Sequence, residues 1–423
     1  MALHLDPADR DAGLLQGLLL STVSMALIVA ISAPVPVLPQ MMRAFAGDPQ
    51  IGRLITLVAV LPAFAIALVS LVAGAIADRI GKRRLLTISA GIFAVSALAP
   101  LWLNSFALIL VSRVITGVAM GMMIVPAVAL TGDYYSGTTR QRWFGIQQGA
   151  TAVAGVAVST LSGALGEMGW RFAFLPLLIG PLLFIGLLAL PEHRLGAQTD
   201  NPDAPAAAQR APWSLWFLVL PLGFLTSALV CPPSYEMGPI LQEKDLGGSG
   251  PTGLLMSVIQ IGSAVAAFNF ARVGRLSLPV SLAIAMLSAA IGAFMIARSP
   301  TLILVGFGCV AAGAAQGMLG PLFLTWLMGK TPPGLYGRAV GSAQTLSYLA
   351  FFLAPLSARQ LAVSLHSSAS AMALIAAADL FVALAAITAR LSRKPISPSP
   401  ETQGHTAHSG PPTRLWRGAS KGP

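Results

Sequence analysis

The chain has 423 residues, of which 55% are hydrophobic and only 10% are charged. A soluble domain carries about 25% charged residues, so this composition excludes an ordinary soluble protein. The formal net charge of +11 would suit nucleic acid, but the basic residues collect on one side of a series of apolar runs. We therefore expect a lipid bilayer, and no nucleic acid, as the surrounding partner.

Twelve apolar runs recur along the chain, and each is long enough to cross a bilayer. A hydrocarbon core about 30 Å thick requires about 20 helical residues. Backbone polar groups must be satisfied inside each span, and the runs show no polar alternation, so they predict helices rather than a barrel. We expect an all-α integral membrane protein with spans at 15–39, 53–77, 85–103, 106–132, 144–165, 171–190, 214–233, 250–271, 278–297, 300–328, 339–363 and 369–391.

The basic residues also predict the orientation. Most of the 26 lysine and arginine residues fall in the N-terminus, the loops after even-numbered spans and the C-terminal tail. Such an excess marks the cytoplasmic side, so we expect both termini in the cytoplasm and the protein in a bacterial inner membrane. Composition divides the chain into a cytoplasmic N-terminus, a six-helix bundle, a flexible linker, a second six-helix bundle and a disordered basic tail, at 1–14, 15–190, 191–213, 214–391 and 392–423.

An internal repeat supports two pseudo-symmetric bundles. Arg113, Gly117 and Gly121 recur with the same spacing as Cys309, Gly313 and Gly317. Small residues four apart let two helix backbones approach closely, so the glycine pairs predict packing faces or sliding surfaces. A duplicated bundle predicts a binding site between its halves.

The segment 74–84, which reads GAIADRIGKRR, is similar to the loop signature of the major facilitator superfamily. The residues that carry the resemblance are Gly74, Asp78, Arg79, Gly81, Lys82, Arg83 and Arg84, together with Arg113, Gly117 and Gly121 of the fourth span. The resemblance implies a secondary transporter with a central cavity and alternating access, closest in pattern to the efflux-permease and drug–proton antiporter groups. In the fifth span, Ser159 and Thr160 stand where the antiporter motif has Gly and Pro.

The charged loop after the second span has two interpretations. It is a positive loop that only fixes topology, or it is a cytoplasmic gate in which Asp78 pairs with the end of a facing helix. In the second interpretation the basic side chains bind helix C-terminal carbonyls and Asp133. Charges at helix ends contribute roughly 0.3–1 kcal/mol each, so several together would bias a two-state equilibrium.

Three further charges lie in or beside predicted spans. Arg113 costs about 2.5–3.5 kcal/mol at mid-span on insertion scales. It either binds backbone carbonyls for packing or serves as a cavity cation for a carboxylate. Asp379 and Glu236 are candidate proton-coupling sites, because a buried carboxylate without a partner tends to stay protonated. The alternatives are a neutral Asp379 bonded to a neighbouring helix and a solvated Glu236 at the mouth.

Uncharged polar residues outline a possible substrate site. Gln260 and Gln316 fall in mid-span, and Gln148 and Gln344 fall near cytoplasmic helix ends. Amides in lipid usually face the bundle because unbonded donors are unfavourable in hydrocarbon. Hydrogen bonding between helices explains the same residues equally well.

The sequence leaves three functions open. The first is a proton-coupled exporter of a small molecule, the second is proton-coupled uptake of an organic anion, and the third is a non-transporting sensor or assembly protein. We expect neither an enzyme nor a cofactor or metal site, because no nucleophile–base pair, metal-ligand cluster or phosphate-binding loop has useful spacing. The expected partners are a small-molecule substrate and protons, and the expected state is a monomer.

Overall fold

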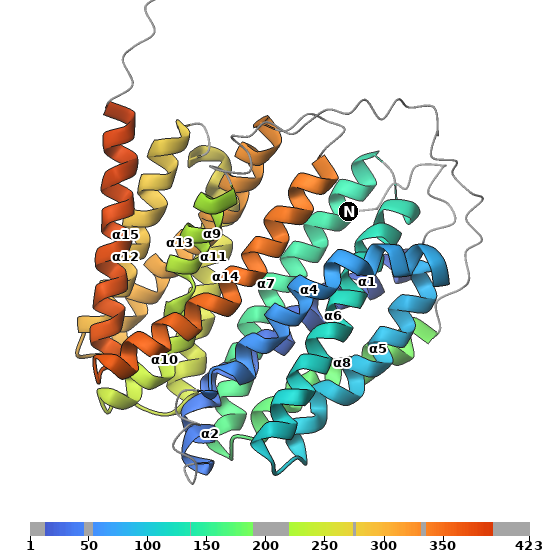
Figure 1. Cartoon of the computed structure of the whole chain (residues 1–423), viewed down its shortest axis with the longest axis horizontal. Helices are drawn as coiled ribbons and strands as arrows, with labels where there is room; N and C mark the ends of the chain where they lie inside the picture. The colour runs from blue at the N-terminus through green and yellow to red at the C-terminus, as the bar shows by residue number, and fades with distance from the viewer. Residues whose placement is uncertain are drawn as a thin grey trace, which may run out of the picture.

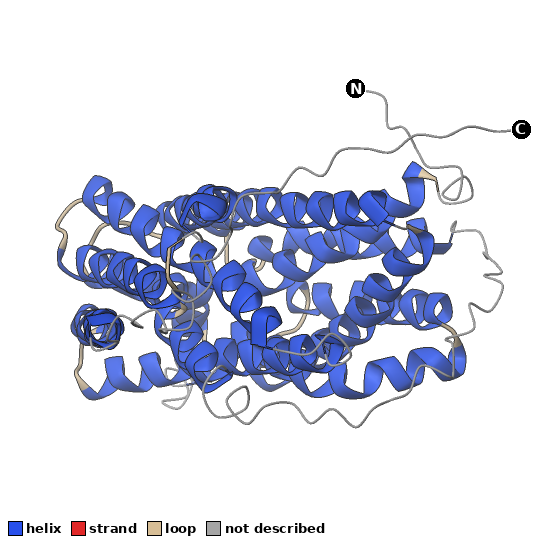
Figure 2. Ribbon diagram, turned by 90° about the horizontal axis from the view of Figure 1, so that it is seen from above, coloured by secondary structure: helices blue, strands red, loops and turns tan. Residues whose placement is uncertain are grey.

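The computed structural model describes residues 13–45, 54–135, 137–188, 220–273, 276–330 and 336–391. Every regular element within these ranges is a helix (Figure 2). The prediction of an all-α membrane fold is therefore confirmed. The expected linker 191–213 and tail 392–423 lie outside the described residues.

Each of the first six expected spans corresponds to a helix or a short series of helices. The elements are α1 (Leu14–Ser32), η2 (Val35–Val37), α2 (Leu38–Ala44), α4 (Leu57–Ile80), α5 (Lys82–Leu98), η3 (Ala99–Leu101), α6 (Phe106–Tyr134), α7 (Gly137–Glu167), η4 (Phe172–Leu178) and α8 (Ile179–Leu188). The first span breaks after Ser32 because Pro34 and Pro36 have no N–H groups to continue the helical hydrogen bonds. The short helices η2 and α2 then carry it on to Ala44.

The second six expected spans correspond to α9 (Leu220–Val230) with α10 (Pro232–Glu243), α11 (Ser249–Val273), α12 (Leu278–Arg298), α13 (Leu302–Lys330), α14 (Tyr336–Ser364) and α15 (Ser368–Leu391). The seventh span differs from its predicted end at residue 233. It breaks at Cys231, before Pro232 and Pro233, and continues as α10. Glu236 consequently lies within a second helical segment rather than beyond the end of the span.

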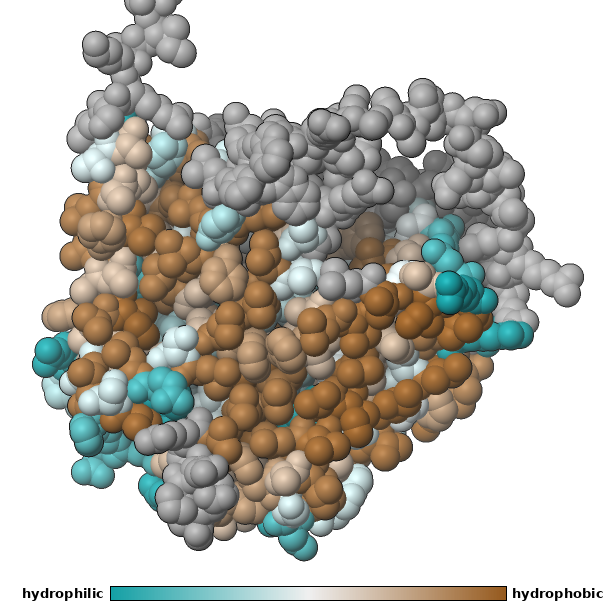
Figure 3. All heavy atoms as spheres, in the orientation of Figure 1, coloured by the Kyte–Doolittle hydropathy of each residue, from teal (hydrophilic) through white to brown (hydrophobic). Residues whose placement is uncertain are grey.

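Nine helices of the described residues are long and apolar enough to cross a membrane, and the bent α4 makes a tenth. The remaining two expected spans lie at η4 with α8 and at α9 with α10, and each runs into residues outside the described ranges. Large hydrophobic side chains are exposed on the outer faces of these helices, among them Val95, Leu182, Phe268, Ile303 and Phe381. The face in Figure 3 shows a broad apolar surface of the kind that contacts lipid.

The helices form two bundles that lie side by side (Figure 1). Within the first bundle α6 packs on α4, and within the second α13 packs on α11. The repeated glycines explain both contacts. A Cβ on Gly117 would lie 2.5 Å from the Pro62 carbonyl oxygen, and one on Gly313 would overlap the Ile259 carbonyl oxygen. The internal repeat thus places the same helix pair in close contact in each half.

The two bundles touch mainly through α7 with α11 and α4 with α14. One end of the assembly carries the α4–α5 turn and the start of α9, and we call it the Lys82 end. The opposite end carries α2, α10 and the start of α11, and we call it the Glu236 end. At α4 and α14 the rings of Phe64 and Phe352 lie 4.6 Å apart, which joins the two halves through an aromatic contact.

Arg113 closes the end of α5. It is completely buried, and its Nη2 donates to the carbonyl oxygens of Ala97 at 2.8 Å and Ser96 at 3.3 Å. The last carbonyls of a helix have no partner within it, and Pro100 supplies no N–H to help. The guanidinium also lies over the Phe174 ring, 5.4 Å from its centroid. A cation at a helix C-terminus is favourable, so this arrangement gives the buried charge a role in packing through Nη2. Nε and Nη1 of the same group are buried without a hydrogen-bond partner in the described ranges.

We expect Arg113→Lys to lower the free energy of unfolding by about 1–3 kcal/mol, because an ammonium group loses the planar fork and the contact with the ring. The thermal unfolding midpoint of the purified protein measures the change. Arg171→Lys is the matched control, since Arg171 binds Leu103 and Asn104 at a partly exposed site and should matter less. Unchanged stability with a selective loss of carboxylate binding would instead support the cavity-cation hypothesis.

Candidate functional site

A cavity of about 400 Å³ lies between the two bundles. Its apolar wall comes from α1, α11, α13 and α14, with Leu27, Ile28, Met256, Leu319 and Phe351 among the lining residues. Its polar side chains are all uncharged, and they are Ser32, Thr151, Ser159, Ser227, Ser234, Tyr235, Gln260, Gln316, Ser347 and Tyr348. A volume of this order is typical of sites for small organic molecules.

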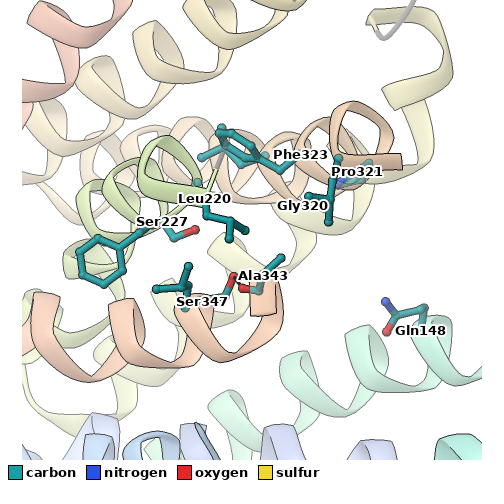
Figure 4. Close-up of a pocket in the computed structure, with 13 residues that line it drawn as sticks. Gln148, Leu220, Ser227, Gly320, Pro321, Phe323, Ala343 and Ser347 are labelled. Atoms are coloured by element: carbon teal, nitrogen blue, oxygen red, sulfur yellow. Dashed lines mark hydrogen bonds between the residues drawn. The ribbon is translucent and has the colours of Figure 1, made fainter. Parts of the chain in front are cut away.

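A second pocket of about 410 Å³ extends this cavity toward the Lys82 end. The two pockets share Ser227, Leu319, Gly320 and Ser347, so they adjoin each other, and we call them together the hollow. Figure 4 shows Gln148 on a helix of the first half, across from the labelled residues of the second half. The hollow therefore opens between the halves at the Lys82 end.

The structure brings three of the four expected glutamines to this hollow. Gln316 donates through Nε2 to the Val230 carbonyl oxygen at 3.0 Å, at the break between α9 and α10. Gln260 places its amide against Gly155 of α7, where an added Cβ would overlap Nε2. Gln148 is exposed in the second pocket. The side chain of Gln344 lies outside what the structure describes.

The hollow is closed toward the Glu236 end by a tight crossing of α7 and α11. A Cβ on Gly163 would lie 2.7 Å from the Ser249 carbonyl oxygen and 2.8 Å from the Gly253 Cα. One turn deeper, Ser257 Oγ donates to the Val156 carbonyl oxygen at 3.0 Å and lies 2.7 Å from Thr160 Oγ1. The segment that departs from the antiporter motif thus forms a polar contact between the halves.

Glu167 strengthens this closure at the end of α7. Its Oε1 accepts a hydrogen bond of 2.6 Å from the Gly250 N–H and lies 3.4 Å from Ser249 Oγ, which in turn accepts from Gln40 Nε2 at 3.0 Å. A carboxylate at a helix N-terminus satisfies a free N–H donor and meets the positive end of the helix dipole. Gln40, Glu167, Ser249 and Gly250 together form what we call the Glu167 clasp, which joins the two halves.

Glu236 lies beside the closed crossing. It is 2% exposed, and its Oε2 is 3.9 Å from Nη1 of Arg359 on α14. Arg359 also reaches the other half, with Nη2 3.5 Å from the Met42 sulfur. The neighbouring Tyr235 lines both the central cavity and the small pocket that contains Glu236 and Arg359. The carboxylate is therefore separated from the cavity by about one side chain.

Asp379, the other candidate proton site, lies elsewhere. It is 1% exposed on α15, which packs on α12, and its Oδ1 has no hydrogen-bond partner within the described ranges. It does not line either of the two pockets between the halves. Arg113 is also absent from their walls, because it faces α5 and Phe174. A carboxylate anchor at Arg113 therefore has no support from the geometry.

The charged loop at the Lys82 end is held within the first half. Lys82 Nζ binds Asp133 Oδ2 at 2.7 Å, which joins α5 to α6. Gly81 makes the turn between α4 and α5 with φ at 94°, a conformation that L side chains rarely adopt. Asp78 is exposed, as are Arg79 and Arg84, and Gly74 has open space where a Cβ would point.

Sequence reasoning missed the residues that close the Glu236 end. Glu167, Gln40 and Arg359 lie at predicted helix ends, where a charged or amide residue usually signals only contact with water. Their partners are a helix N-terminus and a methionine sulfur from the opposite half, and such partners leave no local pattern. Gly163 and Gly253 were an available signal, because a residue without a side chain permits close contact between helices.

The sequence profile of the Major Facilitator Superfamily matches residues 18–355. The chain is 24% identical over 341 residues to the 3-(3-hydroxy-phenyl)propionate transporter of Escherichia coli, covering 78% of this chain and 83% of that protein. It is 26% identical over 259 residues to the multidrug resistance protein MdtL of Klebsiella pneumoniae, covering 58% of this chain and 65% of that protein. Over 168 residues it is 30% identical to the minor myo-inositol transporter IolF of Bacillus subtilis, covering 39% of this chain and 38% of that protein.

Solved structures share the fold at lower identity. A bacterial homologue of the lysosomal transporter Spinster, in an inward-facing and occupied conformation, has a TM-score of 0.70 at 18% identity and covers 89% of this chain and 95% of that chain. A D-xylose–proton symporter has a TM-score of 0.69 at 15% identity and covers 88% and 96%. With two helical halves around a central hollow and a profile match over most of its length, the chain belongs to the major facilitator superfamily and is a multi-pass membrane transporter.

Proposed function

We propose that this secondary transporter exports a small molecule in exchange for protons, by alternating access through the central cavity. The observation that carries the proposal is the asymmetry of the hollow. It continues to the Lys82 end and is closed at the Glu236 end by contacts between the halves. Transport through such a site requires a second state that is closed at the Lys82 end and open at the Glu236 end.

The excess of basic residues supports a cytoplasmic location for the Lys82 end. On this assignment the described state faces inward, both termini lie in the cytoplasm and the membrane is a bacterial inner membrane. A monomer is sufficient for the mechanism, because one chain provides both walls of the cavity. We therefore propose that the transporter acts as a monomer.

Glycines at the Lys82 end support the second state. Gly145 and Gly149 of α7 have no atom within 4 Å of an added Cβ, in contrast to Gly163 at the closed crossing. Gly145 is one turn from Gln148, which lines the hollow, so the two share a helix face. We propose that this empty face, with Gly74, packs against the second half when the Lys82 end closes. Asp78 is exposed in the described state and would then pair with the end of a facing helix. The basic residues Arg79, Arg83 and Arg84 would complete the gate beside the Lys82–Asp133 pair.

A crosslink across the Glu167 clasp should stop transport. Glu167→Cys with Gly250→Cys, in a chain carrying Cys231→Ser and Cys309→Ala, joins α7 to α11 where a Gly250 Cβ would lie 2.9 Å from Glu167 Oε1. Oxidation should abolish vesicle flux, and a reductant should restore it, because the Glu236 end can no longer open. The measurement is flux before and after reduction.

The matched control is Glu243→Cys with Ser367→Cys, which lie at the same end but within the second half. Oxidation of this pair should leave flux unchanged, since it joins elements that move together. Full flux through the crosslinked Glu167–Gly250 pair would contradict alternating access at this interface.

Glu236 is our proposed proton-coupling site. Its carboxylate is buried, and its interaction with Arg359 is a long one at 3.9 Å. Protonation would remove the negative charge that holds Arg359, and Arg359 also contacts Met42 of the opposite half. Proton binding at Glu236 would therefore loosen a contact between the halves. Asp379 remains a second candidate that lacks any comparable link to the interface.

We expect Glu236→Gln to uncouple transport from the proton gradient, because the amide keeps the shape of the side chain but does not titrate. Exchange of labelled for unlabelled substrate should continue, whereas accumulation driven by a pH gradient should fall at least about tenfold. Both are measured in proteoliposomes with a pH-sensitive dye inside.

Glu243→Gln is the control for this experiment, because Glu243 lies on the same helix and binds Ser367 and Ala369 at the exposed helix end. It should retain coupling. Loss of coupling in Asp379→Asn with full coupling in Glu236→Gln would move the proton site to α15.

The direction of transport separates the exporter from its alternatives. Similarity to the multidrug resistance protein MdtL favours export. The second candidate is proton-coupled uptake of an organic anion, and similarity to a transporter of 3-(3-hydroxy-phenyl)propionate favours an organic anion as its cargo. In inside-out vesicles, an exchanger should alkalinise the lumen of acid-loaded vesicles when substrate is added outside. Acidification of an initially neutral lumen together with substrate entry would favour the uptake candidate, and proton and substrate fluxes both absent would favour a sensor or assembly protein.

A further inference from the structure

The walls of the hollow carry no charge in the described part of the chain. We propose that the central cavity takes its substrate as an uncharged molecule, with hydroxyl or amide groups on an aromatic or alicyclic skeleton. This inference rests on the proposed transport function and names the substrate class of the same site. It excludes the anion and the cation as the bound species, whichever direction transport takes.

Among the described lining residues of the two pockets there is no Lys, Arg, His, Asp or Glu. The nearby charges lie outside both walls, since Arg113 binds the end of α5 and Arg359 lies by Glu236. An ion that leaves water for an apolar site without a counter-charge is strongly disfavoured. A neutral molecule meets no such penalty.

The cavity wall contains hydrogen-bonding groups that are not used within the described part of the protein. Gln260 makes no hydrogen bond to another described residue, and its amide sits in the space that Gly155 leaves free. Gln316 uses Nε2 to bind the Val230 carbonyl oxygen, which leaves its own carbonyl oxygen as an acceptor. These are donors and acceptors suited to hydroxyl or amide groups.

The rest of the cavity wall is aromatic and aliphatic. Tyr235, Tyr348 and Phe351 present aromatic rings, and the Tyr348 and Phe351 rings pack edge to face at 6.4 Å. Aromatic side chains favour contact with flat apolar surfaces and with other rings. A cavity of about 400 Å³ accommodates one or two fused rings with a few substituents.

A panel of naphthalene derivatives with one skeleton and different charges tests the inference. The purified full chain in lipid nanodiscs is titrated calorimetrically at neutral pH with 2-naphthol, 2-naphthamide, 2-naphthoate and 2-naphthylmethylammonium. We expect the two neutral compounds to bind at least about tenfold more tightly than either ion. Equal or tighter binding of an ion, or no binding by either neutral compound, would overturn the inference.

Substitutions inside the cavity provide a second test of the preference for uncharged ligands. Gln316→Arg should shift the preference from 2-naphthamide toward 2-naphthoate, because it supplies the missing counter-charge. Asn269→Arg adds the same charge at an exposed position of α11 and should leave the wild-type preference intact. Gln260→Leu should remove the advantage of 2-naphthol over naphthalene. If a variant fails to fold, the wild-type panel still decides.

The outcomes separate this inference from the transport proposal. Tighter binding of 2-naphthoate, combined with substrate-driven proton flux in liposomes, would overturn the uncharged-substrate inference and leave transport standing. Tight binding of the neutral compounds without any flux would overturn transport and leave the binding preference standing.

Discussion

The close crossing of α7 and α11 is the contact on which the described state depends. Backbone meets backbone there because Gly163 and Gly253 have no side chains, and the Glu167 clasp adds a carboxylate to the first turn of α11. Each contribution is small, of the order of 0.3–1 kcal/mol for a charge at a helix end. That scale suits a transporter, since a contact between moving halves must hold one state without preventing the other.

The same helix pair explains why the cavity opens where it does. One end of α7 is fixed to α11 by polar and glycine contacts, while its other end presents Gly145 and Gly149 to open space. One end of α7 thus contacts the opposite half, while the other end packs within its own half through Trp143 and Gln147. This turns a local contact into a difference between the two ends of the protein. Rigid-body motion about a central site requires this kind of asymmetry.

Much of the fold was predictable because lipid imposes strict conditions on a chain. Every expected span corresponds to helix in the described residues, since continuous apolar runs have few alternatives in a bilayer. The breaks after Ser32 and Val230 follow from prolines, yet their consequences for Glu236 needed the three-dimensional path. The site was harder to predict. The sequence marked Gln260 and Gln316 as polar and buried, but it did not distinguish them from Arg113, whose partners are the carbonyls of a neighbouring helix.

Arg113 and the cavity differ in whether a buried charge has fixed partners: Arg113 has them, and the cavity walls carry no charge in the described residues. A buried charge persists where fixed dipoles meet it, as the end of α5 meets Arg113, and these dipoles are provided by the fold itself. Placing charges at the two ends, around Lys82 and Glu236, and leaving the centre neutral separates the control of opening from the recognition of cargo. In this arrangement selectivity arises from hydrogen-bond geometry and ring contacts rather than from ion pairing.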